Sequence, residues 1–355
     1  MKIDDAQSVR KGEELDEGAL LQYLRHHIPG LEGELEVKQF SGGASNLTYL
    51  LRVGEQEMVM RRPPFGAKIK SAHDMGREHK VLAALSKGYD KAPNPLVYCD
   101  DESVIGAPFY VMKRVEGVIL RQDMGKELPP ELVGDIASSL LDSLVELHQL
   151  DYVDVGLADL GRPEGYIKRQ IDGWSRRYQN AKTEDQPEIE YVGRWLDERQ
   201  PKESGSALIH NDYKHDNVIL DAHDLNEVKA ILDWEMCTLG DPLMDLGTSL
   251  SYWMNPDDPQ LFKKSFVNPS VLDGNPTREG LLQMYCEKSG FEVDQPVFYY
   301  AFGLWKTAVV LQQIYYRYQR GHTQDPRFAQ FNVAVKGFGV MASRAIELNR
   351  LDGLM

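Results

Sequence analysis

Two polar stretches in the second half of the chain carry residue types that can do chemistry. The first is HNDYKHDN at residues 210–217, and the second is the end of ILDWE at 231–235. Between them, two short apolar runs flank AHDLNE, whose composition is typical of a turn. We therefore expect a β-hairpin over 218–233, with the two polar stretches at its open end.

The register of this hairpin decides which polar side chains meet at that end. If Leu220 pairs near Lys229, an antiparallel register places Asn217 beside Leu232 and Asp233. An amide oxygen and a carboxylate are hard ligands, and together with phosphate and water oxygens they suit Mg²⁺. The sequence thus predicts a magnesium site that uses Asn217 and Asp233.

Two further side chains precede the hairpin on the loop that enters it. Asp212 lies five residues before Asn217, so its carboxylate can reach the same space and accept a proton from a substrate hydroxyl. Lys214 lies two residues after Asp212 and can balance charge on a transferring phosphate. We predict Asp212 as the general base and Lys214 as its catalytic neighbour.

The elements that must position these groups differ between the two halves of the chain. Residues 35–62 are expected to form three short strands, LEVKQF, LTYLLRV and EMVMRR, which are separated by SGGASN and by a tight turn at Gly54. A helix is expected at about 72–86, and a further β segment, APFYVMKRV, at 107–115.

After residue 130 the apolar residues recur with a helical period. Helices are expected at 130–150, 163–180 and 187–200, and 242–350 is predicted to be mostly helical with polar loops near 255–277 and 321–326. We therefore predict an α+β fold in three parts: an extension with a helix at 1–34, a small β-rich lobe at 35–115, and a larger helical lobe at 116–355.

One charged residue in the expected 72–86 helix requires a partner. A helix turns by about 100° per residue, and this places Glu78 in the middle of the apolar face formed by Met75, Val81 and Leu82. A carboxylate in that position should be paired, because an isolated buried charge is unfavourable. The alternative is that Glu78 reaches solvent at the edge of the helix.

Composition limits the class of protein. The 355 residues are 42% hydrophobic, which is enough for a substantial core, and the net charge of −15 argues against nucleic-acid or anionic membrane partners. Cys99, Cys237 and Cys286 are far apart, which fits a reducing compartment and argues against a zinc site. The N-terminus has no apolar signal core, and the apolar run at 304–314 is short and carries Lys306. We expect a cytoplasmic protein.

The complete polar pattern resembles that of the aminoglycoside phosphotransferase and choline kinase-like superfamily. The shared form is H-x-D-x-x-x-x-N, then D-W-E, then G-D-P-x-x-D-L, and its first part also resembles the catalytic loop of protein kinases. In this chain the pattern comprises His210, Asp212, Asn217, Asp233, Trp234, Glu235, Gly240, Asp241, Pro242, Asp245 and Leu246. The resemblance implies a protein-kinase-like, two-lobed fold, with ATP and Mg²⁺ as cofactors and a small-molecule acceptor.

Three residues of the pattern have structural explanations. In this family position His210 is more often a residue that braces the loop than a catalyst, and Asp245 is expected to brace the catalytic loop without touching substrate. Asp241 can cap the helix that Pro242 begins.

The resemblance also assigns the glycine-rich stretch SGGASNLTY at 41–49 to the loop that covers the nucleotide phosphates. Paired glycines let backbone N–H groups approach phosphates closely, although a simple glycine hairpin is the alternative. The residues predicted to bind the nucleotide here are Ser41, Gly42, Gly43, Ser45 and Asn46.

Kinases place a lysine on the following strand, and in this chain an arginine stands there. Strand alternation favours Arg61 over Arg62 for this position, and Glu78 is then its predicted ion-pair partner. An arginine departs from the family pattern, because its planar fork is not a point charge. The stretch VMKRVEG is predicted to be the hinge between the lobes, where the backbone of Lys113 and Val115 would meet an adenine edge.

Beyond these motifs, the resemblance covers about residues 35–345 and points to one branch of the superfamily. MRRPP, SAHDMGREHKVLAAL, LVELHQLDYVDVGL and YIKRQIDGWSRRY resemble the kinase-like domains fused to animal acyl-CoA dehydrogenases, and stand-alone bacterial relatives that carry the superfamily's aminoglycoside label. The resemblance to the fused proteins implies phosphorylation of a hydroxyl on a hydroxyacyl-CoA or hydroxy acid. An aminoglycoside-, choline- or homoserine-type acceptor is the alternative.

The helical half also offers weak evidence on the acceptor. Basic and aromatic residues share two expected helices: Lys306, Arg317 and Arg320 with Trp305, Tyr315, Tyr316 and Tyr318 on one, and Arg169, Arg176 and Arg177 on the other. Such mixtures suit a carboxylate or a CoA phosphate with an apolar chain, unless they are solvated helix faces and core aromatics. Two other classes are considered: a non-catalytic kinase-fold binding protein, and a hydrolase with a metal–carboxylate site.

Overall fold

The computed structural model describes residues 4–40, 46–65, 74–121, 128–263, 269–323 and 325–355. By their internal contacts the residues of the chain form two compact units. Unit 1 comprises Met1–Ile119, Val153–Leu157 and Val218–Cys237, and unit 2 comprises Leu120–Tyr152, Ala158–Asn217 and Thr238–Met355. The hairpin expected at 218–233 thus belongs to the same unit as the N-terminal sheet.

A five-stranded antiparallel sheet forms the centre of unit 1, in the strand order β1-β2-β3-β5-β4. Its strands are β1 (Leu35–Gln39), β2 (Leu47–Val53), β3 (Gln56–Arg62), β4 (Pro95–Cys99) and β5 (Phe109–Lys113). This confirms the three strands predicted between 35 and 62 and the β segment predicted at 107–115. Strand β4 was not predicted, because a short edge strand that begins with proline has few of the usual strand signals.

The turn between β2 and β3 confirms the role predicted for Gly54. Val53 pairs with Gln56, so Gly54 and Glu55 form a two-residue turn. Gly54 has a φ of +59°, and a Cβ there would lie 2.6 Å from the carbonyl oxygen of Glu32. Glycine is therefore required both by the backbone conformation and by the space available.

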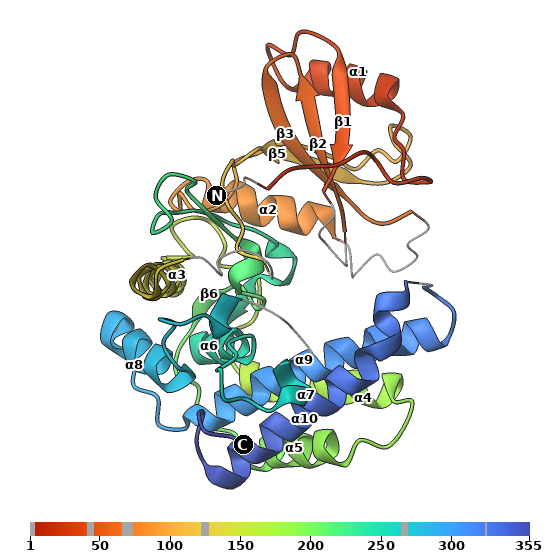
Figure 1. Cartoon of the computed structure of the whole chain (residues 1–355). Helices are drawn as coiled ribbons and strands as arrows, with labels where there is room; N and C mark the ends of the chain where they lie inside the picture. Colours follow the sequence, from red (N-terminus) through yellow and green to blue (C-terminus); the bar gives the residue numbers. More distant parts are fainter. Residues whose placement is uncertain (1–3, 41–45, 66–73, 122–127, 264–268, 324) are drawn as a thin grey trace. The chain divides into compact units, whose positions relative to one another are not determined.

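Two helices, α1 (Glu17–His27) and α2 (Met75–Leu85), pack against the strands of unit 1. Helix α1 begins after Asp16, whose side chain accepts a hydrogen bond from the third residue of the helix, and it buries Leu20 and Leu24 in the core of the sheet (Figure 1). Helix α2 confirms the helix predicted near 72–86, and Asp74 caps it in the same way.

The predicted hairpin is also present in unit 1. Strands β7 (Val218–Leu220) and β8 (Val228–Ile231) pair antiparallel, with Val218 opposite Ile231. That is the register expected for the open end. An irregularity after Ile219 places Leu220 opposite Val228, the residue before the predicted Lys229. A 3₁₀ turn, η3 (Trp234–Met236), follows β8.

Unit 2 is mainly helical, as predicted. Its helices are α3 (Pro130–Gln149), α4 (Tyr166–Ala181), α5 (Pro187–Glu198), α6 (Pro242–Ser251), α7 (Gln260–Lys263), α8 (Arg278–Ser289), α9 (Pro296–Gln319) and α10 (Phe331–Leu348). Two three-residue strands, β6 (Ala207–Ile209) and β9 (Thr238–Gly240), form a small sheet that was not predicted. In the described parts of the chain, no helix combines the length and the apolar character that crossing a membrane requires.

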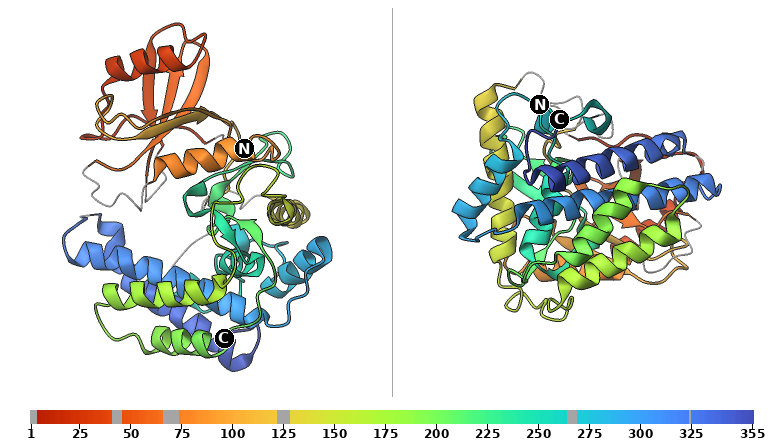
Figure 2. Two further views of the ribbon diagram at one scale, coloured as in Figure 1. Left: turned by 180° about the vertical axis from the view of Figure 1, so that it is seen from behind. Right: turned by 90° about the horizontal axis from the view of Figure 1, so that it is seen from below.

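Helices α9 and α10 run side by side in both views of Figure 2. Helix α6 also packs on α9, and their backbones come very close. A Cβ on Gly247 of α6 would lie 2.1 Å from the carbonyl oxygen of Tyr299, and a Cβ on Gly303 would lie 2.1 Å from that of Gly247. The two glycines therefore let the helix backbones touch. This crossing fixes where the next turn of α9, which carries Lys306, lies in unit 2.

Candidate active site

The loop between β6 and the hairpin holds Asp212 in a dense set of hydrogen bonds. Its Oδ2 accepts from Lys214 Nζ at 2.7 Å and from Asn217 Nδ2 at 3.0 Å, and its Oδ1 accepts from the Tyr252 hydroxyl at 2.6 Å. The structure thus brings together Asp212, Lys214 and Asn217, three of the residues predicted from the sequence.

The electrostatics of this cluster keep Asp212 ionised. Burial opposes ionisation, but the Lys214 ammonium and the hydrogen bonds from Lys214 and Tyr252 outweigh it and lower the pKa of the Asp212 carboxyl. Burial, and then the negative charge of Asp212, raise the pKa of the Tyr252 hydroxyl, so this hydroxyl stays protonated and donates. The carboxylate is therefore fixed in direction and ready to accept a hydrogen bond.

The side-chain amide of Asn217 has a nitrogen that donates hydrogen bonds and an oxygen that can bind a metal. Its Nδ2 donates to the backbone carbonyl of Asp212 at 2.9 Å as well as to the carboxylate. Because both of these bonds use the nitrogen, the amide oxygen is the atom that can ligate a metal. A neutral hard oxygen of this kind fits Mg²⁺.

Asp245 braces the catalytic loop, as predicted. Its two carboxylate oxygens accept from the backbone N–H groups of His210 and Asn211, each at 2.7 Å. The buried imidazole of His148 lies 3.1 Å from the same carboxylate, and this contact, against the effect of burial, lowers the pKa of Asp245. Both carboxylate oxygens of Asp245 are thus engaged in hydrogen bonds that hold the loop.

His210 and Asp241 also have the structural roles predicted for them. The Nδ1 atom of His210 accepts from the backbone N–H of Asp212 at 3.2 Å. Asp241 accepts from the N–H of Leu243 at 2.9 Å, which caps α6, and it also accepts from the backbone and side chain of Ser204.

Three residues of this cluster were not predicted for their roles. Tyr252 and His148 carry no signal in the sequence, because only the fold brings them to Asp212 and Asp245. Lys306 was placed on an acceptor-binding surface, but it is 4% exposed and its ammonium donates to the backbone carbonyl of Asn211 at 2.7 Å. A lone lysine in an apolar run does give a signal, the same one that identified Glu78.

Unit 1 contains the second group of predicted residues. Arg61 lies on β3 and contacts Glu78 Oε1 through Nη1 at 2.5 Å, which confirms the predicted ion pair. Its Nη2 contacts Asp233 Oδ1 at 2.9 Å. Arg62 instead donates to the backbone carbonyls of Pro63 and Ile105. Strand alternation therefore selected the correct arginine.

This arginine is held in its charged form. Burial would lower the pKa of Arg61, but the charges of Glu78, Tyr110 and Asp233 raise it well above its ordinary value. Burial raises the pKa of Glu78, which is 1% exposed, against the opposing effect of Arg61. A cation that cannot be lost suits a site for phosphate charge.

Asp233 stands at a strained point of the backbone. It has a φ of +67°, in the left-handed region that non-glycine residues seldom occupy, and it links β8 to the 3₁₀ turn. Its side chain is 31% exposed although Arg61 contacts one of its oxygens. The carboxylate is therefore accessible, and its oxygens fit Mg²⁺.

The residues predicted to hold the nucleotide are only partly described. Ser41, Gly42, Gly43 and Ser45 lie outside the described residues. Asn46 is described, and its Nδ2 donates to Glu235 Oε2 at 2.8 Å.

The predicted hinge residues end strand β5. The N–H of Lys113 donates to the carbonyl of Asn94 at 2.9 Å, so this N–H is already used within the fold. Val115 packs on an apolar cluster that contains Ile219 and Ala230. Ile219 and Ala230 are themselves buried, whereas Val115 is only partly buried.

The basic and aromatic residues predicted for the acceptor have different surroundings. Trp305 is buried and donates to the carbonyl of Ile189 at 3.1 Å, and Arg169 donates to two backbone carbonyls. Arg177 stacks on Trp174, with its guanidinium carbon 4.5 Å from the ring centre. Of these residues, Trp305 and Arg169 are therefore engaged in the fold, whereas Arg177 keeps an exposed charge.

No group of three or more His, Cys, Asp or Glu side chains among the described residues is arranged to hold a metal ion. A metal bound through Asn217 or Asp233 would thus require further oxygen ligands from phosphate and water. Kinase-type sites for Mg²⁺ are of this kind.

Comparisons with known proteins agree with this chemistry. The model of a family described as the phosphotransferase enzyme family matches residues 36–279. Acyl-CoA dehydrogenase family member 11 of Gallus gallus is 34% identical over 350 residues, which is 96% of this chain and 44% of that protein. The chain thus spans less than half the length of this relative.

Solved structures confirm the predicted α+β, kinase-like fold. A candidate aminoglycoside phosphotransferase of Ralstonia eutropha JMP134 is 29% identical, with a TM-score of 0.80 over 94% of this chain and 99% of that one. The GDP complex of aminoglycoside 2'-phosphotransferase-IIIa has a TM-score of 0.61 at 15% identity, over 91% and 98% of the two chains. Choline kinase of Cryptosporidium parvum has a TM-score of 0.61 at 14% identity, over 94% and 97%.

Proposed function

The chain belongs to the phosphotransferase enzyme family, and from this premise we propose that it transfers the γ-phosphate of Mg·ATP to a hydroxyl of a hydroxyacyl-CoA or hydroxy acid. One observation carries the proposal. Asp212 is a carboxylate kept ionised and aimed by Lys214, Tyr252 and Asn217, on a loop that Asp245 holds from behind.

In the proposed reaction Asp212 orients the acceptor hydroxyl and takes its proton. The hydroxyl oxygen forms the new bond to phosphorus while the bond from phosphorus to the oxygen of ADP breaks. The low pKa of Asp212 makes it a weak base, so it takes the proton late, once the oxygen has become acidic by bonding to phosphorus. Lys214, beside the same carboxylate, balances negative charge on the group in transit.

Asn217 and Asp233 are the residues we propose as ligands of Mg²⁺, through the amide oxygen of one and a carboxylate oxygen of the other. When bound, the ion would neutralise charge on the phosphates. Arg61, which Glu78 holds at its Nη1, would add a second fixed positive charge for the same phosphates.

For the nucleotide we propose the residues of the N-terminal sheet. The glycine-rich segment with Asn46 would cover the phosphates, and the carbonyl of Lys113 with the backbone of Val115 would bind the base edge. The partly buried side chain of Val115, which packs on the apolar cluster that includes Ile219, would lie against the ring. The GDP complex of a structural neighbour supports nucleotide use, but the choice of ATP over GTP rests on the kinase resemblance.

For the acceptor we propose an anionic, acyl-type molecule. Lys214 lies against Asp212, and Arg177 on α4 has an exposed charge, whereas a polycationic aminoglycoside needs clustered carboxylates. The name of the Gallus gallus relative supports an acyl-CoA. The match covers less than half of that protein, so dehydrogenase activity is not part of this proposal.

The test is an acceptor screen in which ADP release is counted only when it depends on the acceptor. The wild-type chain and Asp212→Asn are incubated with Mg·ATP and matched concentrations of 4-hydroxyacyl-CoA esters, free hydroxy acids, choline, homoserine and kanamycin. We expect turnover with the hydroxyacyl compounds and a loss of about 10²–10⁴-fold in Asp212→Asn, with nucleotide affinity retained. Phosphorylation of kanamycin alone would overturn the acceptor class. Nucleotide binding without turnover on any compound would favour a binding protein, and acceptor-independent phosphate release a hydrolase.

A further inference from the structure

We propose that Lys306 is a positioning residue, which fixes the Asn211–Asp212 peptide group and thereby the direction of the Asp212 carboxylate. The inference rests on the proposed function, because it concerns the same base. Lys306 lies on α9, about 95 positions away from the loop in sequence, and its Nζ donates to the Asn211 carbonyl at 2.7 Å. A second contact joins Nζ to Asn211 Oδ1 at 3.3 Å.

The peptide group in question is held at both of its ends. Its carbonyl, from Asn211, accepts from Lys306, and its N–H, from Asp212, donates to His210 Nδ1 at 3.2 Å. A change in ψ of Asn211 or φ of Asp212, the two angles that flank this peptide group, would turn the side chain of Asp212 relative to the loop. The plane therefore sets where the base points.

Asn211 has a conformation that needs such support. Its φ is +66°, in the left-handed region, which asparagine tolerates better than most residues but still at some cost. Asp245 accepts its N–H at 2.7 Å, and the Tyr166 hydroxyl donates to its Oδ1 at 3.1 Å. Lys306 completes this arrangement, because it binds the backbone carbonyl of Asn211, which neither Asp245 nor Tyr166 contacts.

The reach of Lys306 is set by backbone geometry. Gly247 and Gly303 bring α6 and α9 into contact, and Lys306 lies three residues after Gly303 on the same side of α9. The next residue, Thr307, contacts Ser251 at 3.2 Å through the two hydroxyl groups. Helix α9 is thus held against α6 on both sides of Lys306, whose ammonium group then reaches the loop.

Packing alone does not account for a lysine here. A methionine has nearly the same length and would fill the site without burying a charge. The charged groups around Lys306 are Asp212 and Lys214 from the loop, Asp245 from α6 and Arg177 from α4. Two attract the ammonium and two repel it, so the surroundings do not single out a cation for stability.

The main rival is that Lys306 binds the acceptor directly, and steady-state kinetics separate the two roles. For Lys306→Met we expect kcat to fall by about 10²-fold, with KM for Mg·ATP and for the acceptor changed less than about threefold. Lys336→Met, on the exposed side of α10, is the matched control and should behave as wild type. A higher acceptor KM at unchanged kcat would assign Lys306 to substrate binding and overturn the proposal.

Chemical rescue tests whether the lost ammonium is the cause. In Lys306→Ala, added n-propylamine should restore kcat at least about tenfold, because a small amine can enter the vacated space and donate to the Asn211 carbonyl. The same amine should have no effect on Asp212→Asn. Absence of rescue together with wild-type kcat in Lys306→Met would overturn the proposal.

A measurement that needs no turnover keeps the two proposals distinguishable. Hydrogen–deuterium exchange of the segment 208–216 should be faster in Lys306→Met than in wild type, and unchanged in Lys336→Met. If the wild-type chain phosphorylates no acceptor, the proposed function fails while the exchange result still decides whether Lys306 fixes the loop. Unchanged exchange in Lys306→Met would show that it does not.

Discussion

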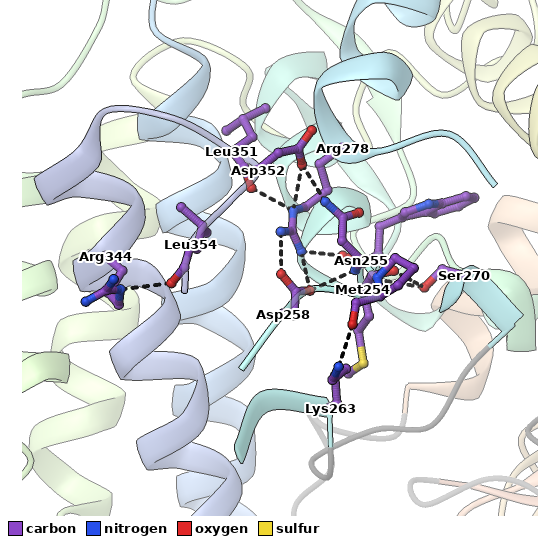
Figure 3. Close-up of polar contacts among 12 residues, drawn as sticks. Met254, Asn255, Asp258, Lys263, Ser270, Arg278, Arg344, Leu351, Asp352 and Leu354 are labelled. Atoms are coloured by element: carbon purple, nitrogen blue, oxygen red, sulfur yellow. Dashed lines mark hydrogen bonds and ion pairs between the residues drawn. The ribbon is translucent and has the colours of Figure 1, made fainter. Parts of the chain in front are cut away.

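Two buried arginines, one in each unit, are paired with carboxylates in contrasting ways. In unit 2, Arg278 makes a two-pronged contact with Asp258, at 2.7 and 2.6 Å, and neither side chain is exposed. Nη1, which makes one of these two contacts, also donates to the backbone carbonyl of Trp253 at 3.0 Å, and Nε donates to that of Leu351 at 2.8 Å (Figure 3). The guanidinium is thus satisfied by the protein alone.

Arg61 in unit 1 is less completely satisfied. It contacts Glu78 at 2.5 Å and Asp233 at 2.9 Å, and Glu235 more distantly at 3.9 Å, and its Nε has no hydrogen-bond partner among the residues that the structure describes. The Asp233 side chain is also 31% exposed, whereas that of Asp258 is fully buried. The difference indicates that Arg278 closes a structural joint, while Arg61 and Asp233 retain capacity for a ligand.

The joint at Arg278 holds the last residues of the chain. Asp352 accepts from Asn255 Nδ2 at 2.6 Å, and Arg344 donates to the carbonyl of Leu354 at 2.8 Å (Figure 3). Arg278 also binds the carbonyl of Trp253, and the preceding residue, Tyr252, donates its hydroxyl hydrogen bond to Asp212. The cluster is thus linked through two adjacent residues to one of the hydrogen-bond donors of Asp212.

The largest effect expected is on stability, from Arg278→Met. Removing one partner of a buried, hydrogen-bonded pair leaves Asp258 uncompensated, so the free energy of unfolding should fall by about 3–5 kcal/mol. Urea unfolding measures this change. Arg344→Met is the matched control, since it removes a single bond to a carbonyl and should lower the free energy by about 1 kcal/mol. Equal effects of the two variants would contradict the assignment of Arg278 as the joint.

The second prediction concerns the coupling between Arg61 and Glu78. A double-mutant cycle with Arg61→Met and Glu78→Gln should give a coupling energy of about 1–3 kcal/mol in urea unfolding, because each charge is buried against the other. Turnover should be lost in both single variants. A coupling energy near zero would show that the two side chains do not meet in solution.

The third prediction tests the exposed carboxylate of the pair. Asp233→Ala should weaken the affinity for ATP in the presence of Mg²⁺ by at least about tenfold, or about 1.4 kcal/mol, and leave the affinity without Mg²⁺ nearly unchanged. Calorimetric titration at two Mg²⁺ concentrations makes this comparison. Asp224→Ala, in the exposed turn of the same hairpin, is the control. The same loss of affinity with and without Mg²⁺ would count against Asp233 as a metal ligand.

The contrast between Glu78 and Lys306 shows what sequence reasoning can find in such clusters. Both residues are charges inside apolar helical stretches, and the expectation that a buried charge needs a partner led to the Arg61–Glu78 pair. The same reasoning was not applied to Lys306, whose partner is a backbone carbonyl and carries no residue signal. Helical periodicity identifies a buried charged residue. Its partner can be predicted from the sequence only when that partner is a charged side chain or part of a motif, and not when it is a backbone carbonyl.

Whether a strand or helix could be predicted from the sequence also depended on how clear its residue pattern was. Strands β2 and β3 and helix α3 have long, regular apolar patterns and were predicted, whereas β6 and β9 have three residues each, too few for a pattern to emerge. Tyr252 and His148 depend on how α3 and α6 pack around the catalytic loop. Residues of that kind follow from tertiary structure, and a single sequence does not specify them.

The smallest effect expected extends the comparison to a third buried cation. Lys306 donates to a neutral carbonyl, and burial lowers its pKa to about 8 despite the attraction of Asp245 and Asp212. In the unfolded chain its pKa is near 10.4, so between these values the unfolded state binds more protons. The free energy of unfolding of the wild type should therefore rise with pH through 8, relative to a variant that cannot titrate.

Lys306→Met provides that reference, and the prediction concerns the difference between the two proteins. From pH 7 to pH 9 the wild type should gain about 1 kcal/mol in unfolding free energy relative to Lys306→Met, because its buried ammonium loses the proton that is unfavourable there. Other groups titrate equally in both proteins and cancel. Lys336→Met should run parallel to the wild type over the same range, since that side chain is exposed. If the curve of Lys306→Met is also parallel, Lys306 keeps an ordinary pKa, and its ammonium must then be solvated rather than buried against the catalytic loop.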